Sequence, residues 1–208
     1  MSTHDASSKP PTPATTTPPS TAALPPQPMT IEEADRRLQA PGSPFELARE
    51  EVLGVPMQVY KNRARSLREL LAASAVHGDK DYIVFSDGRR WSFRDHLADV
   101  ASVAAALRDR YGIGHGDAVA ILSANTPEWI LTYWATVSLG AVVIAMNGWW
   151  AEDEIAYGLD LSKPKLLFAD RKRMERLDGF RDRCQIVGFE DEFESLLRHA
   201  PGAPLPTT

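Results

Sequence analysis

The chain has 208 residues, 43% hydrophobic and 25% charged, which is ordinary for a globular protein with one sizeable core. Its net charge of -5 provides no excess of Lys or Arg to neutralise a phosphate backbone, which argues against a nucleic-acid partner. No apolar run reaches the roughly 18 to 20 residues that span a bilayer, and no targeting pattern precedes the fold. The single cysteine, Cys184, excludes an internal disulfide and suits a reducing compartment, so a cytoplasmic location is predicted.

The first 80 residues are predicted to contain a tail and a helical lead-in. Residues 1–28 are almost entirely Ser, Thr, Pro, Ala and Gln, a composition that cannot bury enough apolar surface to fold, so they are predicted to be disordered. The folded protein is expected to begin at Met29, which is also a candidate start codon. Capping patterns at 30–33, 43–46 and 66–69 each predict a short helix, giving a helical lead-in over 29–80.

A hairpin and a long helix are predicted next. Two β-rich runs, 82–85 and 90–93, flank Asp87-Gly88, a strong hairpin-turn signal. Ser92 followed by Asp95 caps a helix that ends at Tyr111-Gly112, with apolar residues recurring at helical spacing.

From residue 117 onward, apolar strands alternate with helices. Strands are predicted at 117–123, 141–145, 165–168 and 185–189, and helices at 126–140, 152–161, 171–177 and 190–199. Continuous apolar strands indicate a parallel sheet covered on both faces. The predicted fold is therefore α/β, with a largely parallel sheet, helices on both faces and right-handed crossovers. This subdomain covers 81–199, and 200–208 is predicted to be the start of a linker.

Most candidate reactive residues have structural explanations. The glycine cluster at 112–116 ends a helix and opens a strand, whereas a phosphate loop does the reverse, so a turn is predicted. The five histidines show no pair at metal-ligand spacing, and Cys184 suits a small packing residue better than a nucleophile. Acidic residues near 152–154 and 190–194 stabilise helix N-termini. No catalytic residue and no metal ligand are predicted.

The segment Asn147-Gly148-Trp149-Trp150 is the one candidate binding segment. It follows an apolar strand, where loops at the carboxyl ends of parallel strands form ligand crevices. Asn147, Trp149 and Trp150 are therefore candidates to line a substrate channel. The alternative is that one ring packs on the following helix while the other covers the sheet edge.

Four stretches resemble the N-terminal part of the AMP-binding, adenylate-forming enzymes, a superfamily that includes acyl-CoA synthetases. They are 91–97, 116–129 with Asn125, Glu128 and Trp129 in place, 135–147, and 161–170. Their order and spacing together are specific, and the resemblance covers Met29 to about His199. The opening from Met29 and the Asn-Gly-Trp-Trp segment most resemble bacterial fatty-acid and related acyl-CoA ligases.

The resemblance implies a two-step reaction for a complete enzyme. A carboxylic acid, expected to be a fatty acid, would attack ATP to give an acyl-adenylate, and CoA would then displace AMP, with Mg²⁺ neutralising the pyrophosphate. In relatives the Ser/Thr/Gly-rich phosphate loop, the nucleotide contacts and the C-terminal lysine all lie beyond the region that this chain matches. No catalytic residue is carried over, so this chain alone is predicted to bind no cofactor and to be inactive.

Three interpretations of the whole chain follow. The first is an N-terminal fragment of an acyl-CoA synthetase. The second is a non-catalytic α/β subunit or remnant that pairs with a separate chain, for which an uncovered strand edge at Phe189 would need a partner. The third is an unrelated flavodoxin-like binding module, against which the missing phosphate-binding turn counts. The first two predict no ATP or AMP binding, and aggregation or binding of a hydrophobic dye.

Overall fold

The computed structural model describes residues 29–206, and the chain divides into two compact units at Arg63 and Ala64. The first unit contains α1 (Ile31–Leu38), β1 (Leu47–Val52) and β2 (Val55–Tyr60). The side chain of Thr30 caps α1 by accepting the Glu33 N–H at 3.2 Å, as the capping pattern predicts. The predicted disordered tail, 1–28, lies outside the described residues.

The prediction of a second helix after the capping pattern at 43–46 is wrong, because residues 47–60 form an antiparallel hairpin. Its turn residues Leu53 and Gly54 both have positive φ, as the two-residue turns that match strand twist require. Glu46, the expected capping residue of that helix, instead accepts the Gly42 N–H at 2.8 Å and pairs with Lys61. Pairing with the Val-rich second strand therefore outweighs the local capping pattern.

The second unit opens with α2 (Leu67–Ala73), the 3₁₀ helix η1 (Ser74–His77), β3 (Asp81–Val84) and β4 (Arg90–Ser92). β3 and β4 pair antiparallel, so the predicted hairpin is confirmed. α3 (Phe93–Tyr111) is the predicted long helix, capped reciprocally by Ser92 and Asp95 and ended by Gly112 in the left-handed conformation at φ 60°.

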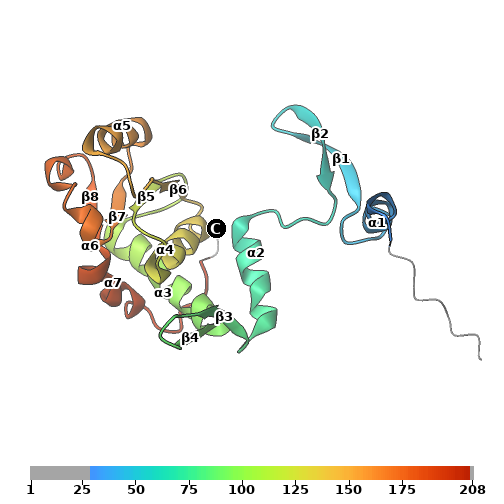
Figure 1. The fold of residues 1–208 in the computed structure, drawn as a ribbon, viewed down its shortest axis with the longest axis horizontal. Helices are drawn as coiled ribbons and strands as arrows, with labels where there is room; N and C mark the ends of the chain where they lie inside the picture. Colours follow the sequence, from blue (N-terminus) through green and yellow to red (C-terminus); the bar gives the residue numbers. More distant parts are fainter. Residues whose placement is uncertain (1–28, 207–208) are drawn as a thin grey trace, which may run out of the picture. The chain divides into compact units, whose positions relative to one another are not determined.

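The remaining elements form the predicted α/β layer structure (Figure 1). They are β5 (Ala118–Leu122), α4 (Pro127–Ser138), β6 (Val142–Ala145), α5 (Glu152–Ser162), β7 (Leu166–Ala169), α6 (Arg171–Met174), η2 (Asp178–Phe180), β8 (Gln185–Gly188) and α7 (Phe189–Leu197). The four strands are parallel in the order β6-β5-β7-β8. α6 is shorter than predicted, and Phe189 begins α7 rather than ending the last strand. Phe189 is buried in the core, and among the described residues the edge strands of the sheet are β6 and β8.

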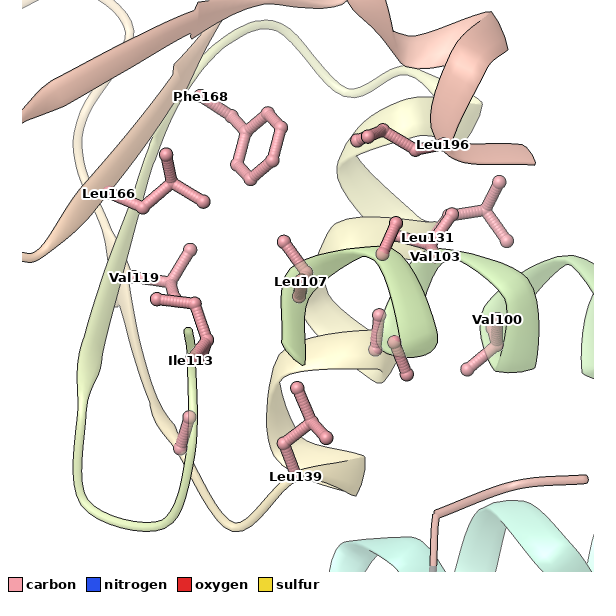
Figure 2. Packing of buried hydrophobic residues seen from close by; sticks show 14 of the residues in the cluster. Val100, Val103, Leu107, Ile113, Val119, Leu131, Leu139, Leu166, Phe168 and Leu196 are labelled. Atoms are coloured by element: carbon pink, nitrogen blue, oxygen red, sulfur yellow. The ribbon is translucent and has the colours of Figure 1, made fainter. Parts of the chain in front are cut away.

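Helices cover both faces of this sheet, and each face has its own buried cluster. On one face, α3, α4 and α7 pack against alternate residues of the strands; Figure 2 shows Leu107 of α3 facing Val119 and Leu166. On the other face, α5 and the α6–η2 segment pack against the intervening strand residues, such as Leu122 and Leu167. Cys184 is half-buried against this second cluster, and burial raises the pKa of its thiol.

The connections between the strands share one hand. α4 links β5 to β6 across the first face, whereas α5 links β6 to β7 in the opposite direction across the second face. As a result, α4, which follows β5, and α6, which follows the neighbouring strand β7, lie on opposite faces of the sheet. Such a switch in direction opens a crevice outside the carboxyl ends of the two strands, where ligands of open α/β sheets bind.

Candidate functional site

The carboxylate of Asp170 occupies the crevice between the carboxyl ends of β5 and β7. Asp170 follows the last residue of β7 and is 7% exposed. One carboxylate oxygen, Oδ2, accepts the Ala124 N–H at 2.8 Å and the Ser123 hydroxyl at 3.2 Å, both just after β5. The other, Oδ1, accepts the Arg173 N–H at 2.9 Å and so caps α6. Asp170 thus joins the ends of two neighbouring strands.

Arg173 extends the connection to a third strand. It donates from a terminal guanidinium nitrogen to Asp170 Oδ2 at 3.0 Å and from Nε to the Gly148 carbonyl, in the loop after β6, at 3.1 Å. Arg176 also donates to the Gly148 carbonyl, at 2.9 Å, and to the Trp150 carbonyl. The side chains of Asp170 and Arg173 are both 10% exposed, so the ion pair is buried.

The charge state of Asp170 follows from these contacts. Burial alone would raise the pKa of this carboxyl, but hydrogen bonds from the Ala124 and Arg173 N–H groups and the charge of Arg173 lower it below its ordinary value. Sequence reasoning missed this pair. The signal was present, since an Asp directly after a buried strand and an Arg three residues later can form a cap and an ion pair together.

This crevice does not fit the phosphate group of a nucleotide. The Ala124 N–H, which would face a phosphate, is already bound to the Asp170 carboxylate. The pocket beside it has a volume of about 120 Å³ and is lined by Thr126, Phe189 and three carboxylates, those of Glu128, Asp170 and Glu190. Three carboxylates repel an anion. The Ala124 N–H is therefore engaged within the protein, and the pocket beside it is acidic.

The predicted binding segment 147–150 lies in the loop after β6. Asn147 shapes this loop, because its Oδ1 accepts the Trp149 N–H at 3.0 Å and its carbonyl accepts the Trp150 N–H at 3.0 Å. The Asn147 side chain is thus engaged in a local turn.

The two tryptophans lie in different surroundings. Trp149 is 81% exposed, and its ring centre lies 5.8 Å from the Arg173 guanidinium and 6.0 Å from Lys172 Nζ. It lines a pocket of about 230 Å³ with Gly148, Glu175 and the cationic residues Lys172, Arg173 and Arg176. Trp149 therefore presents a largely free aromatic ring on a basic surface.

Trp150 packs on α5. A Cβ added to Gly158 would lie 2.8 Å from its ring, so only glycine leaves room for it. The outer side of Trp150 lines a pocket of about 310 Å³ with Asp153, Glu154 and Tyr157. The structure thus places Trp149 beside basic residues and Trp150 beside acidic ones, in separate pockets.

The other sequence features have structural roles. Gly112 and Gly116 have positive φ, and Asp117 accepts the Gly114 N–H at 2.8 Å, so the glycine cluster is the predicted turn. Within residues 29–206, no three His, Cys, Asp or Glu side chains are grouped so that they could hold a metal ion. Over the same residues, no helix combines the length and apolarity needed to cross a bilayer.

Comparison with known proteins agrees with this fold. Residues 70–202 match the model of the AMP-binding enzyme family. The chain is 32% identical over 118 residues to the acyl-CoA ligase sidI of Beauveria bassiana, covering 56% of this chain and 20% of that protein. It is 34% identical over 132 residues to the medium/long-chain-fatty-acid–CoA ligase FadD6 of Mycobacterium tuberculosis, covering 63% and 22%.

Solved structures show the same architecture. The N-terminal domain of FACL13 from Mycobacterium tuberculosis superposes with a TM-score of 0.64 at 23% identity, covering 70% of this chain and 38% of that one. The fold is thus that of the N-terminal domain of adenylate-forming enzymes, and the chain belongs to the AMP-binding enzyme family. It spans about a fifth to a quarter of the length of the first curated relatives that it matches.

Proposed function

We propose that this chain is the N-terminal portion of an ATP-dependent acyl-CoA synthetase. The complete enzyme would join a carboxylic acid to the α-phosphate of ATP, releasing pyrophosphate, and CoA would then displace AMP to give the acyl-CoA thioester. The acid is expected to be a fatty acid. The observation that carries this proposal is the family match over 70–202, supported by relatives that are named acyl-CoA or fatty-acid–CoA ligases.

The chemistry of the crevice supports the proposal that this chain alone lacks the groups needed for catalysis. Nucleotidyl transfer needs preorganised positive charge and backbone donors at the triphosphate. In this chain the carboxylate of Asp170 occupies the crevice between the carboxyl ends of β5 and β7 and accepts the Ala124 N–H. The residues that would hold ATP and Mg²⁺ are therefore expected in another part of a complete synthetase, and this portion would supply scaffold and part of a substrate channel.

Within that channel, we propose that Trp149 contacts CoA. The nucleotide end of CoA carries an adenine ring and phosphates, and an exposed aromatic ring beside cations offers stacking and charge to both. Trp149, with Lys172 beside it, has this combination. Asn147 would position Trp149 through the turn, and Trp150 would anchor the loop to α5.

Steady-state kinetics of a complete synthetase that contains this chain would test the channel proposal. Trp149→Ala and Lys172→Ala should each raise the KM for CoA several-fold while leaving formation of the acyl-adenylate, measured by pyrophosphate exchange, unchanged. Tyr157→Ala, which removes an exposed aromatic ring from the acidic pocket, is the matched control and should alter neither. An unchanged KM for CoA in both Trp149 and Lys172 variants would reject a CoA contact at this surface.

A second role, as a non-catalytic subunit that pairs with a separate chain, is favoured by the two edge strands of the parallel sheet. β6 and β8 each pair with one neighbour only among the described residues. The edge strand β6 is Val-Val-Ile-Ala, without a charge or proline to discourage pairing with another strand.

Reading the gene and its transcript past the codon for Thr208 in all three frames separates the two roles. An open frame that continues into a Ser/Thr/Gly-rich loop ending in Lys supports the synthetase. A stop codon with no such loop nearby in any frame contradicts a synthetase encoded in one chain and favours a partner subunit.

A further inference from the structure

A further pocket of the second unit is lined by the β3–β4 hairpin, α3, α4 and α7, and not by the loops after β6 and β7. Its volume is about 600 Å³, within the range of small-molecule sites. Apolar walls come from Trp91 of β4, Leu131 of α4 and Phe193 of α7. All these elements belong to the second unit, so the pocket is internal to one compact body.

Carboxylates from three different helices line this apolar pocket. They are Asp99 of α3, Glu128 of α4 and Glu194 of α7. Glu194 is paired with Arg198 at 2.6 Å. Among residues 29–206, Asp99 and Glu128 have no ion-pair partner. An anionic group against apolar walls is costly unless a cation compensates it.

Arg89 and Arg90 also line the pocket, but each pairs with a carboxylate other than Asp99. Arg89 pairs with Asp87 at 2.7 Å and lies over the ring of Phe85, and Arg90 pairs with Asp81. Trp91 lines the same pocket as Asp99. Burial raises the pKa of Asp99, and the charges of Asp95 and Glu194 raise it further. Asp99 therefore has two other carboxylates near it and, among residues 29–206, no ion-pair partner.

We propose that this pocket binds an organic cation, a guanidinium or ammonium group carried on an apolar body. The charged head would pair with Asp99, and the apolar body would lie between Trp91, Leu131 and Phe193. A metal ion is not favoured, because the carboxylates do not form a three-ligand group. A small amphiphile and a basic side chain of another polypeptide segment both have this combination of a cationic head and an apolar body. The proposal does not depend on the ligase activity.

The test uses the 208-residue chain and the indole N–H resonance of Trp91, which lines the same pocket as Asp99. Hexylguanidinium is titrated against hexanol and hexanoate, which have the same apolar body with a neutral or an anionic head. We expect saturable shifts of the Trp91 resonance with hexylguanidinium at least tenfold tighter than with hexanol, and weakest with hexanoate. Equal affinity for all three, or no saturable shift with hexylguanidinium, would overturn the proposal.

Two variants identify the charge that recognises the head. Asp99→Asn removes the charge with little change in size and should remove the tenfold preference while hexanol binding persists. Glu128→Gln should reduce the preference in part. Asp182→Asn, an exposed site with the same change in charge, should keep it. A preference that survives in Asp99→Asn contradicts the assigned head contact.

A peptide distinguishes the two possible sources of the cation. If a capped Leu-Arg-Leu peptide binds tighter than hexylguanidinium, the source is a polypeptide. If the peptide binds more weakly, the source is a small amphiphile.

Discussion

Asp170 and Arg173 form a buried ion pair, 3.0 Å between oxygen and nitrogen, at the crevice where α/β sheets of this topology usually bind their ligands. Through hydrogen bonds to Ala124 and Gly148 the pair links the loops after three of the four parallel strands. A structural contact thus occupies a position that is functional in many other α/β folds.

Removing one partner of this pair should destabilise the second unit strongly. Asp170→Ala leaves the Arg173 charge and the Ala124 N–H uncompensated, with an expected loss of about 3 kcal/mol or more in the free energy of unfolding. Urea unfolding followed by far-UV circular dichroism measures it. Asp178→Ala, which breaks the exposed pair with Arg181, is the control and should change little. Equal losses in the two variants would contradict a special role for Asp170.

The pH dependence of stability should report His96. This ring packs against Tyr82 with ring centroids 4.1 Å apart and is 1% exposed. Neither ring nitrogen has a hydrogen-bond partner among the described residues. Burial lowers its pKa from 6.5 to about 4. Between these values the unfolded chain binds a proton that the folded chain does not, so stability should fall as pH drops from 6.5 towards 4.

The expected size of this effect is about 3 kcal/mol, at 1.36 kcal/mol for each unit of the pKa shift. Thermal or urea unfolding between pH 7 and 4 measures it, and His96→Leu should flatten this part of the profile. His115→Gln, at an exposed position, should leave the slope unchanged. The assignment fails if the slope is the same with and without His96, because the protonating group then lies elsewhere.

Local signals predicted the layered part of the chain well, and the reason is visible in its residues. Strands such as β5 and β7 are continuous apolar runs because both faces are buried, and Ser92 with Asp95 marks the start of α3. The segment after Ser43 was mispredicted because strand pairing, a contact between residues distant in sequence, overrode a local cap. The Asp170–Arg173 pair is local and could have been predicted from its spacing. Its contacts with Ala124 and Gly148 could not, because these residues come from other strand ends that only the topology brings together.

The packing between α3 and the sheet should dominate stability. Leu107 is fully buried and faces Val119 and Leu166 (Figure 2), so Leu107→Ala leaves a cavity and should cost about 2 to 5 kcal/mol. Leu161→Ala, at a position that is 72% exposed, is the matched control and should change the free energy of unfolding by less than about 0.5 kcal/mol. Similar losses for both leucines would mean that this cluster is not the main core.

The purified chain should show no saturable binding of MgATP or AMP. The Ala124 N–H is bound to Asp170, and the adjoining carboxylates of Glu128 and Glu190 repel phosphate. Isothermal titration calorimetry up to millimolar nucleotide measures this, and a complete acyl-CoA synthetase is the positive control. Saturable binding that Asp170→Asn strengthens would show that this crevice holds phosphate after all. Binding that Asp170→Asn leaves unchanged would place a nucleotide site elsewhere on this chain and would contradict the incomplete role proposed for it.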